Sequence, residues 1–316
     1  MENLTGLILF DKAAGLSSYD IVRKVKKSLN IKKVGHFGTL DPFATGLLPI
    51  AVGSSTRLSE YLLEKDKKYI FTIELGKETD TLDAYGKIVK EAPVPSDFPK
   101  KIQDVILSFV GLIEQEPPSY SALKFAGRPL YEYMRTQGKL PINMSEKKRH
   151  INIYELELIH FDSTKKQITL KLFCSKGTYV RSLARDIAKL LGTVGFCKEL
   201  RRTEVGEFSI ENALQTKEES CFVKEFLIDN ILSPEKTLSH VPLIFLHNLK
   251  FKKAFEAGNV FLCQMTDLKC EEPGFSYMNQ MPSDIFLKLD NKTMFLCSCK
   301  IESHDLVRIY PKKRII

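Results

Sequence analysis

Apolar and polar residues alternate along the chain in patterns that predict both helices and strands. Between residues 17 and 29, apolar side chains recur at helical spacing behind serines that can cap a helix. Residues 69–75 and 168–172 alternate with a period of two, which indicates strands with one buried face. Two more helices are expected over residues 98–110 and 180–191, because each apolar pattern is followed by a glycine.

The pattern changes late in the chain. Residues 203–240 contain eight Asp and Glu against three Lys, and short apolar runs typical of strands begin at Val241. We therefore expect a domain boundary there, with a mixed α+β domain over residues 1–240 and a small β-rich module over residues 241–316. The basic run at residues 311–314 either contacts phosphate or faces water.

Composition favours a soluble globular protein. The 316 residues are 43% hydrophobic and 27% charged, which is enough to build a sizeable core. No stretch approaches the roughly 18 to 20 apolar residues of a membrane span, and the first residues lack the features of a signal peptide. Seven cysteines, an odd number, fit reduced thiols better than a disulfide framework. These features predict a cytoplasmic protein and argue against the secreted, fibrous, disordered and membrane classes.

The positive charge is concentrated in one segment. The chain has a net charge of +8, and residues 124–149 alone hold seven Lys and Arg against two Glu. Phe125, Tyr131 and Tyr133 lie in the same segment. Cations that reach phosphates beside aromatic rings that stack on bases are typical of proteins that bind looped RNA. The alternative is a solvated helix face whose aromatic rings pack in the core.

Residues 35–49 predict a tightly shaped loop. They include three glycines and two prolines around the ionisable residues His36 and Asp41. The loop lacks the glycine patterns of phosphate-binding loops. An aspartate before a proline is also common in plain turns, so the residues alone leave its role open.

Several segments carry a family resemblance through their order and spacing. They are Asp11–Ser18, Gly35–Pro49, Tyr69 with Leu75–Asp83, Gln115–Lys124, Leu130–Tyr133, Ser175–Arg181 and Leu200–Arg202. Together they resemble the bacterial tRNA pseudouridine-55 synthase family (TruB type) over residues 7–205. Ala13 and Phe37 depart from the family pattern, and neither departure removes an ionisable group. The resemblance implies a central, mostly antiparallel sheet flanked by helices, followed by a shortened or diverged RNA-binding PUA-like module.

The resemblance also implies an active site. Asp41 would be the catalytic carboxylate, which either attacks the sugar at C1′, attacks the base at C6 or removes the 2′ proton. Arg181 would keep Asp41 ionised, Tyr69 would stack on the uracil and help the C5 proton leave, and His36 would hold the displaced base. The alternatives are a surface arginine beside Asp186, a tyrosine packed on its own strand and a plain loop histidine.

The same resemblance implies the substrate and its contacts. The enzyme would flip the target uridine out of the T arm of tRNA, and a mobile insertion at about residues 124–150 would close over the RNA. The implied substrate-binding residues are His36, Asp83, Lys124, Arg128, Tyr131, Tyr179 and Leu200. No cofactor, metal, guide RNA or obligate protein partner is expected, and the protein is expected to be a monomer. Asp80 and Asp83 are interpreted as polar support for the site.

The sequence leaves three alternatives. The first is a non-catalytic RNA-binding protein, and the joint presence of Asp41, Tyr69 and Arg181 argues against it. The second is a member of the guide-RNA branch of the synthases, and the lack of a long basic tail argues against it. The third is a C-terminal zinc site formed by Cys263, Cys270, Cys297 and Cys299, whose spacing is poor for zinc ligands.

Overall fold

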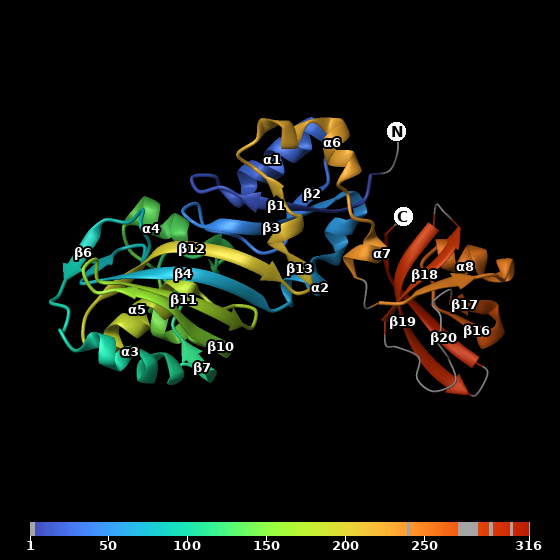
Figure 1. Ribbon diagram of the computed structural model, residues 1–316. Coiled ribbons are helices and arrows are strands. Elements are labelled where there is room, and N and C mark those ends of the chain that lie inside the picture. The colour runs from blue at the N-terminus through green and yellow to red at the C-terminus, as the bar shows by residue number, and fades with distance from the viewer. Residues whose placement is uncertain (1–3, 239–240, 271–283, 291–292, 304–305, 316) are drawn as a thin grey trace.

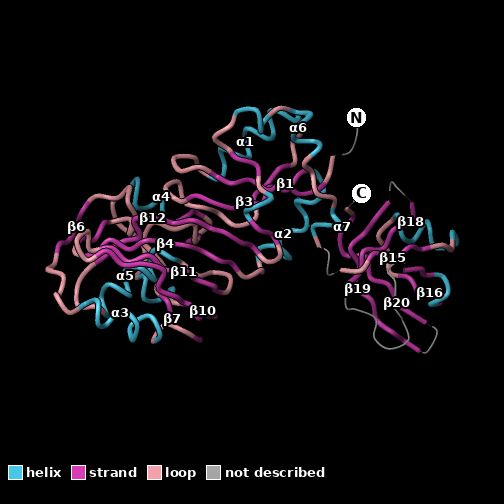
Figure 2. The backbone as a smooth tube through the Cα atoms, viewed as in Figure 1, coloured by secondary structure: helices cyan, strands magenta, loops and turns pink. Residues whose placement is uncertain are grey.

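The computed structural model describes residues 4–238, 241–270, 284–290, 293–303 and 306–315. Within these ranges the strands form one sheet of ten strands, a second sheet of six and two short two-stranded ribbons. Figures 1 and 2 show the two sheets as separate blocks, with the chain passing from the first to the second after α7 (Pro234–Thr237).

The large sheet forms the centre of the molecule. Its strands are β1 Gly6–Lys12, β2 Val34–His36, β3 Thr45–Val52, β4 Lys67–Leu75, β7 Gly111–Gln115, β10 Arg149–Asp162, β11 Gln167–Cys174, β12 Gly195–Val205, β13 Phe208–Ser209 and β14 Leu214–Gln215. Their order is β14-β1-β3-β12-β4-β11-β10-β7, with β2 beside β3 and β13 beside β12. All neighbouring pairs are antiparallel except β1 with β14 and β3 with β12. The predicted mixed fold with a mostly antiparallel sheet is confirmed.

Besides α7, the helices in the described residues are α1 Ser18–Leu29, α2 Ser59–Leu63, α3 Phe98–Leu107, α4 Leu130–Gln137, α5 Val180–Leu190, α6 Lys224–Asp229 and α8 Lys252–Glu256. Of these, α8 packs against the second sheet. The short 3-10 helices are η1 Gly53–Leu58, η2 Met144–Lys147, η3 Ile210–Asn212, η4 Glu219–Phe222, η5 Leu249–Phe251 and η6 Met265–Asp267. In Figure 1, α3 and α5 cover one face of the large sheet, and α1 and α6 lie together near β1. The two ribbons are β5 Lys77–Thr79 with β6 Ile88–Glu91, and β8 Lys124–Phe125 with β9 Arg128–Pro129.

The local predictions agree with these elements. Ser17 caps α1 in a reciprocal arrangement in which its hydroxyl accepts from the backbone of Asp20 while the Asp20 carboxylate accepts from Ser17. The helix expected over 98–110 is shorter and ends at Leu107, because residues 108–110 form the turn into β7.

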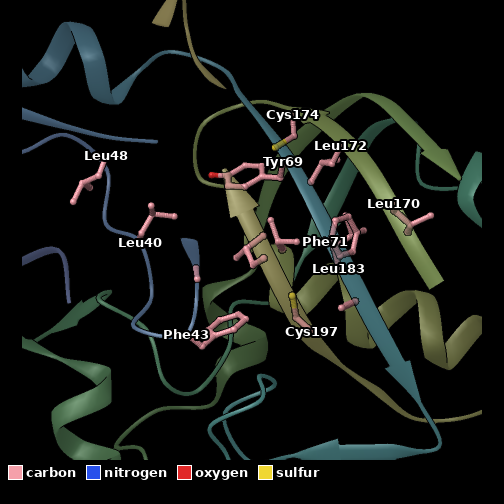
Figure 3. Close-up of a cluster of buried hydrophobic side chains, with 14 of the residues drawn as sticks. Leu40, Phe43, Leu48, Tyr69, Phe71, Leu170, Leu172, Cys174, Leu183 and Cys197 are labelled. Atoms are coloured by element: carbon pink, nitrogen blue, oxygen red, sulfur yellow. The ribbon is translucent and has the colours of Figure 1, made fainter. Parts of the chain in front are cut away.

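The core of the large sheet lies around β4 and α5. Phe71, Leu170 and Leu183 are almost completely buried and come from β4, β11 and α5 respectively. Figure 3 shows this cluster and, at its edge, Tyr69 on β4 beside Cys174. Burial of aliphatic and aromatic side chains on this scale provides the main driving force for the fold. Because this core holds β4 in place, it also fixes the position of Tyr69, a residue of the candidate site.

The second sheet contains the predicted C-terminal strands. Its strands are β15 Leu243–Leu246, β16 Phe261–Gln264, β17 Leu268–Cys270, β18 Asp284–Asp290, β19 Thr293–Ser303 and β20 Leu306–Arg314. Phe286, Met294 and Leu296 pack in one buried cluster with Leu58 and Leu62 from η1 and α2. The second sheet is therefore joined to the large one by an apolar contact, and the position of a domain boundary near residue 241 stays a prediction.

The basic run at residues 311–314 belongs to β20. Lys312 lies 2.6 Å from the carboxylate of Asp284, and Lys313 lies 2.8 Å from that of Glu60. Arg57 donates a 2.6 Å hydrogen bond to the carbonyl oxygen of Arg314. Two of the tail cations therefore pair with carboxylates within the protein.

Candidate active site

The loop that carries Asp41 lies between β2 and β3 and is held by its own backbone. Phe37 N–H donates to the carbonyl of Pro49 at 2.9 Å, and Ala44 N–H donates to that of Asp41 at 3.1 Å. From α1, the Ser18 hydroxyl bonds both the N–H and the carbonyl of Leu40, at 2.9 and 3.0 Å. The loop therefore presents Asp41 in a fixed position.

Arg181 lies in the first turn of α5 and contacts Asp41 directly. Its Nε lies 2.8 Å from Asp41 Oδ2, and its Nη2 donates a 3.2 Å hydrogen bond to Oδ1. The Nε contact is an ion pair without hydrogen-bond geometry. The Arg181 side chain is 5% exposed and that of Asp41 is 33% exposed, so the carboxylate alone is accessible to a substrate.

The rest of the Arg181 guanidinium is fixed by other acceptors. Nη1 donates to the carbonyl of Thr81 at 2.7 Å, and Nη2 donates to that of Tyr120 at 2.9 Å. Nη1 also lies 3.4 Å from Asp83 Oδ2. Burial raises the pKa of Asp83, and hydrogen bonding from Thr81 and the charge of Arg181 oppose this. Asp83 therefore holds the arginine from the side opposite Asp41.

Tyr69 and Arg202 are direct partners on the adjacent strands β4 and β12. Burial raises the pKa of Tyr69 to about 12, and the neighbouring Arg202 guanidinium partly opposes this rise. In Figure 3 the Tyr69 hydroxyl points away from Leu170 and Leu172. The tyrosine is therefore a neutral phenol at physiological pH, with a cation beside it.

Arg202 is itself buried beneath the Asp41 loop. Its Nε donates to the carbonyl of Leu47 at 2.8 Å and its Nη2 donates to that of Gly38 at 3.0 Å. Sequence reasoning placed Arg202 in a family motif but gave it no role in the site. The sequence indicated Arg202 through its place as the last residue of the segment Leu200–Arg202.

Thirteen residues surround a cavity of about 240 Å³ beside the ion pair of Asp41 and Arg181. They are Thr39, Leu40, Asp41, Tyr69, Ser121, Ala122, Arg149, Gly177, Thr178, Tyr179, Val180, Arg181 and Leu200. Five predicted site residues therefore meet at one cavity: Asp41, Tyr69, Tyr179, Arg181 and Leu200.

Tyr179 is fixed at this cavity by its backbone and its ring. The Gln115 side chain accepts from the Tyr179 N–H at 2.8 Å and donates to its carbonyl at 3.1 Å. The Arg149 guanidinium lies 4.3 Å from the centre of the Tyr179 ring. Arg149 Nε is buried and makes no hydrogen bond within the described part of the chain. Arg149 is a site residue that the sequence indicated only as the last cation of the basic segment.

The other predicted contact residues do not line the cavity. His36 lies on β2, where burial and then the charge of Arg202 lower its pKa. Lys124 is exposed on β8. Arg128 forms a 3.0 Å ion pair with Glu132 instead of facing the cavity. Tyr131 lies on α4 with its ring beneath the Arg135 guanidinium. Their roles toward RNA stay predictions.

Lys12 is a second buried cation that the sequence did not single out. Its ammonium donates to the carbonyls of Ala13, Leu16 and Pro42, at 3.0, 2.8 and 3.4 Å. Burial lowers the pKa of Lys12 to about 8, and the charge of Asp41 opposes this shift. Lys12 thereby ties the 13–16 loop to the residue that follows Asp41.

No cluster of three or more metal-ligating side chains occurs within the residues that the structure describes. Among the proposed zinc ligands, burial raises the pKa of Cys263 and of Cys299 to about 12. The side chain of Cys270 lies outside the described residues. Within the same limits, no helix is long and apolar enough to cross a membrane.

Solved structures share this fold. A protein chain of an H/ACA ribonucleoprotein bound to a substrate RNA containing 2′-deoxyuridine aligns with a TM-score of 0.66 over 98% of this chain and 85% of that chain, at 23% identity. A chain of a Cbf5–Nop10–Gar1 complex aligns with a TM-score of 0.67 over 98% and 85%, at 24% identity. These likenesses show that the chain shares the fold of these two proteins over nearly its whole length.

Sequence comparison then gives the family. Residues 26–180 match the model of the TruB family pseudouridylate synthase N-terminal domain. Proteins named tRNA pseudouridine synthase B from Francisella philomiragia and Hydrogenovibrio crunogenus are 45% and 40% identical. The first alignment covers 77% of this chain and 79% of the relative, and the second covers 82% of each. The chain belongs to the TruB family of pseudouridylate synthases, which confirms the resemblance.

Proposed function

We propose that this protein converts uridine to pseudouridine in tRNA, and that its target is the uridine at position 55 in the T loop. Family membership and the relatives named tRNA pseudouridine synthase B support the reaction and the class of RNA. The structural observation that carries the proposal is the ion pair of Asp41 with Arg181 at the wall of a cavity that Tyr69 also lines.

The reaction rearranges bonds within one nucleotide. The bond between N1 and C1′ breaks, the uracil turns, and C5 bonds to the same C1′. The proton on C5 leaves, and N1 ends protonated. No electron, phosphate or external group enters, so the chemistry requires no cofactor.

Asp41 is the group proposed to start this rearrangement. The Arg181 guanidinium, which also donates to the carbonyls of Thr81 and Tyr120, contacts both oxygens of the Asp41 carboxylate and fixes their position at the cavity. Because the Asp41 side chain is 33% exposed, its oxygens are open to a nucleotide in the cavity. Attack at C1′, attack at C6 and removal of the 2′ proton all use this carboxylate.

Tyr69 is proposed to stack on the uracil. Stacking requires only the neutral ring, which is the form that a pKa of about 12 maintains. Accepting the C5 proton requires the phenolate, and Arg202 on the adjacent strand stabilises that anion. His36, Tyr179 and Leu200 are proposed to contact the displaced nucleotide or its neighbours.

The insertion is proposed to hold the RNA loop. Two of its apolar side chains, Leu130 and Met144, are buried, with 1% and 7% exposed. Its exposed Lys124 is available to phosphates, and Arg128 and Tyr131 would join after rearrangement of their present pairs. We further propose that a monomer acts on the T arm in the cytoplasm without guide RNA or an obligate protein partner.

The test is to incubate the purified chain with an unmodified tRNA transcript and a T-arm RNA, without guide RNA, cofactor or added metal. Pseudouridine is then mapped by primer extension after carbodiimide treatment. The expected product is pseudouridine at the T-loop uridine in both RNAs. Product at another position would contradict the proposed target, and binding without any product would favour a non-catalytic RNA-binding protein.

A further inference from the structure

A large aromatic side chain next to the loop that carries Asp41 is exposed to solvent. Tyr85 is 61% exposed, and its ring centre lies 6.3 Å from that of Phe43 at an interplanar angle of 65°. Phe43 is buried and follows Asp41 by two residues in the same loop. The Tyr85 ring therefore lies against the catalytic loop while most of its surface is open to solvent.

The turn that carries Tyr85 is tightly constructed. Asp80 N–H donates to the carbonyl of Lys87 at 3.0 Å, and Lys87 N–H donates to Asp80 Oδ1 at 2.8 Å. Leu82 has a φ of +60°, in the left-handed region. A Cβ on Gly86 would lie 2.3 Å from Thr81 Oγ1, so only glycine fits there. The position of the turn is thus fixed before any ligand binds, which lowers the entropic cost of using it for recognition.

The turn is also connected to the ion pair of the candidate site. Asp83 accepts the Tyr85 N–H at 3.0 Å through Oδ1 and lies 3.4 Å from Arg181 Nη1 through Oδ2. Arg181 in turn pairs with Asp41. One carboxylate therefore sets the position of the Tyr85 backbone relative to the arginine that contacts the catalytic aspartate.

We propose that Tyr85 forms a stacking subsite for a nucleobase next to the target uridine in the substrate RNA. The inference rests on the proposed function. When a uridine leaves the loop, the flanking bases lose a stacking partner, and an exposed aromatic ring beside the site replaces it. Neither Asp41 nor Tyr69 supplies this contact, because the proposed function places both against the target nucleotide itself.

The test compares wild type, Tyr85→Ala and Tyr85→Phe on T-arm RNA, with kcat and KM measured from initial rates of pseudouridine formation. Phe161→Ala is the matched control, because Phe161 is 40% exposed near the far end of β10. That end is roughly 40 Å along the strand from Arg149, which lines the cavity. Each enzyme is also assayed on two RNAs that lack the base immediately 5′ or 3′ of the target.

Tyr85→Ala is expected to raise KM by about tenfold or more with little change in kcat, in line with the usual contribution of base stacking. Tyr85→Phe and Phe161→Ala should remain within about twofold of wild type. On the RNA that lacks the stacked base, wild type and Tyr85→Ala should have the same KM. The subsite would be overturned if the KM of Tyr85→Ala still differed from that of wild type on both abasic RNAs. It would also be overturned if Tyr85→Ala had no effect on the intact RNA. If wild type forms no pseudouridine, the proposed function fails instead.

Discussion

Arg202 lies directly opposite Tyr69 on the adjacent strand, with its guanidinium buried under the loop that carries Asp41. The guanidinium donates hydrogen bonds to the carbonyls of Gly38 and Leu47, which lie on either side of Asp41 in the segment 35–49. It also opposes the rise that burial causes in the pKa of Tyr69. One buried cation therefore supports both the shape of the loop and the charge environment of the tyrosine.

Replacing this cation should affect stability strongly. Arg202→Met keeps an apolar stem but leaves the carbonyls of Gly38 and Leu47 without their donors, so we expect a loss of about 2–5 kcal/mol in the free energy of unfolding. Urea denaturation measures it. Arg308→Met is the control, because Arg308 is 44% exposed and forms a surface pair with Glu302, which is worth less than about 1 kcal/mol. Equal losses in the two variants would refute the structural role of Arg202.

Lys12 gives a prediction for the pH dependence of stability. Because burial lowers the pKa of Lys12 from 10.5 to about 8, the folded chain binds this proton less tightly than the unfolded chain. The contribution of Lys12 to the free energy of unfolding therefore rises between pH of about 8 and 10.5. The free energy of unfolding of wild type minus that of Lys12→Met, measured by urea denaturation across this range, should increase with pH. A difference that stays constant or shrinks would contradict the burial of this ammonium.

Gly46, on β3, shows how closely this strand approaches β12. Its φ is +111°, and a Cβ there would lie 2.2 Å from the carbonyl oxygen of Arg202. Gly15 also has a positive φ, of +88°, but a Cβ there would meet nothing within 4 Å. Gly15→Ala should therefore cost only about 1–2 kcal/mol of backbone strain, and Gly46→Ala should cost at least about 2 kcal/mol more. Thermal or urea unfolding of both variants checks this, and similar costs would mean that the strands are further apart than described.

The insertion predicts the salt dependence of RNA binding. Lys124, Lys139 and Lys147 are exposed, so replacing all three with Gln should weaken T-arm RNA binding. The slope of log affinity against log salt should fall by up to about 2–3, while kcat at saturating RNA stays within a few-fold. The control is the triple Gln variant of Lys100, Lys166 and Lys189, which are equally exposed but lie elsewhere. An unchanged slope in the Lys124 variant, or the same change in the control, would exclude the insertion as the phosphate contact.

The sequence predicts local structure well where the pattern is local. Ser17 and the apolar spacing after it define α1, and the alternation over residues 69–75 defines most of β4, because capping and amphipathic patterns depend on neighbours in the chain. The contact between Asp41 and Arg181 joins residues 140 positions apart. It depends on the parallel pairing of β3 with β12, and only the family resemblance indicated it.

The buried cations were missed for a physical reason. Lys and Arg are usually exposed, so composition and periodicity place them on the surface. Lys12 and Arg202 are buried because carbonyls of sharply turning loops need donors, and those carbonyls are brought together only by the tertiary fold. Similarly, the sequence assigns the charge of Arg128 to RNA, whereas Arg128 on β9 pairs with Glu132 on α4.

The central claim is that Asp41 is the catalytic carboxylate, and single-turnover pseudouridine formation by Asp41→Asn on T-arm RNA tests it most directly. Asp186→Asn is the matched control, because Asp186 forms an aspartate–arginine pair with Arg185 on the helix that carries Arg181. Asp41→Asn should bind the RNA within a few-fold of wild type and react more than about a thousandfold more slowly, while Asp186→Asn keeps the wild-type rate. An Asp41→Asn enzyme that reacts within tenfold of wild type would contradict the account.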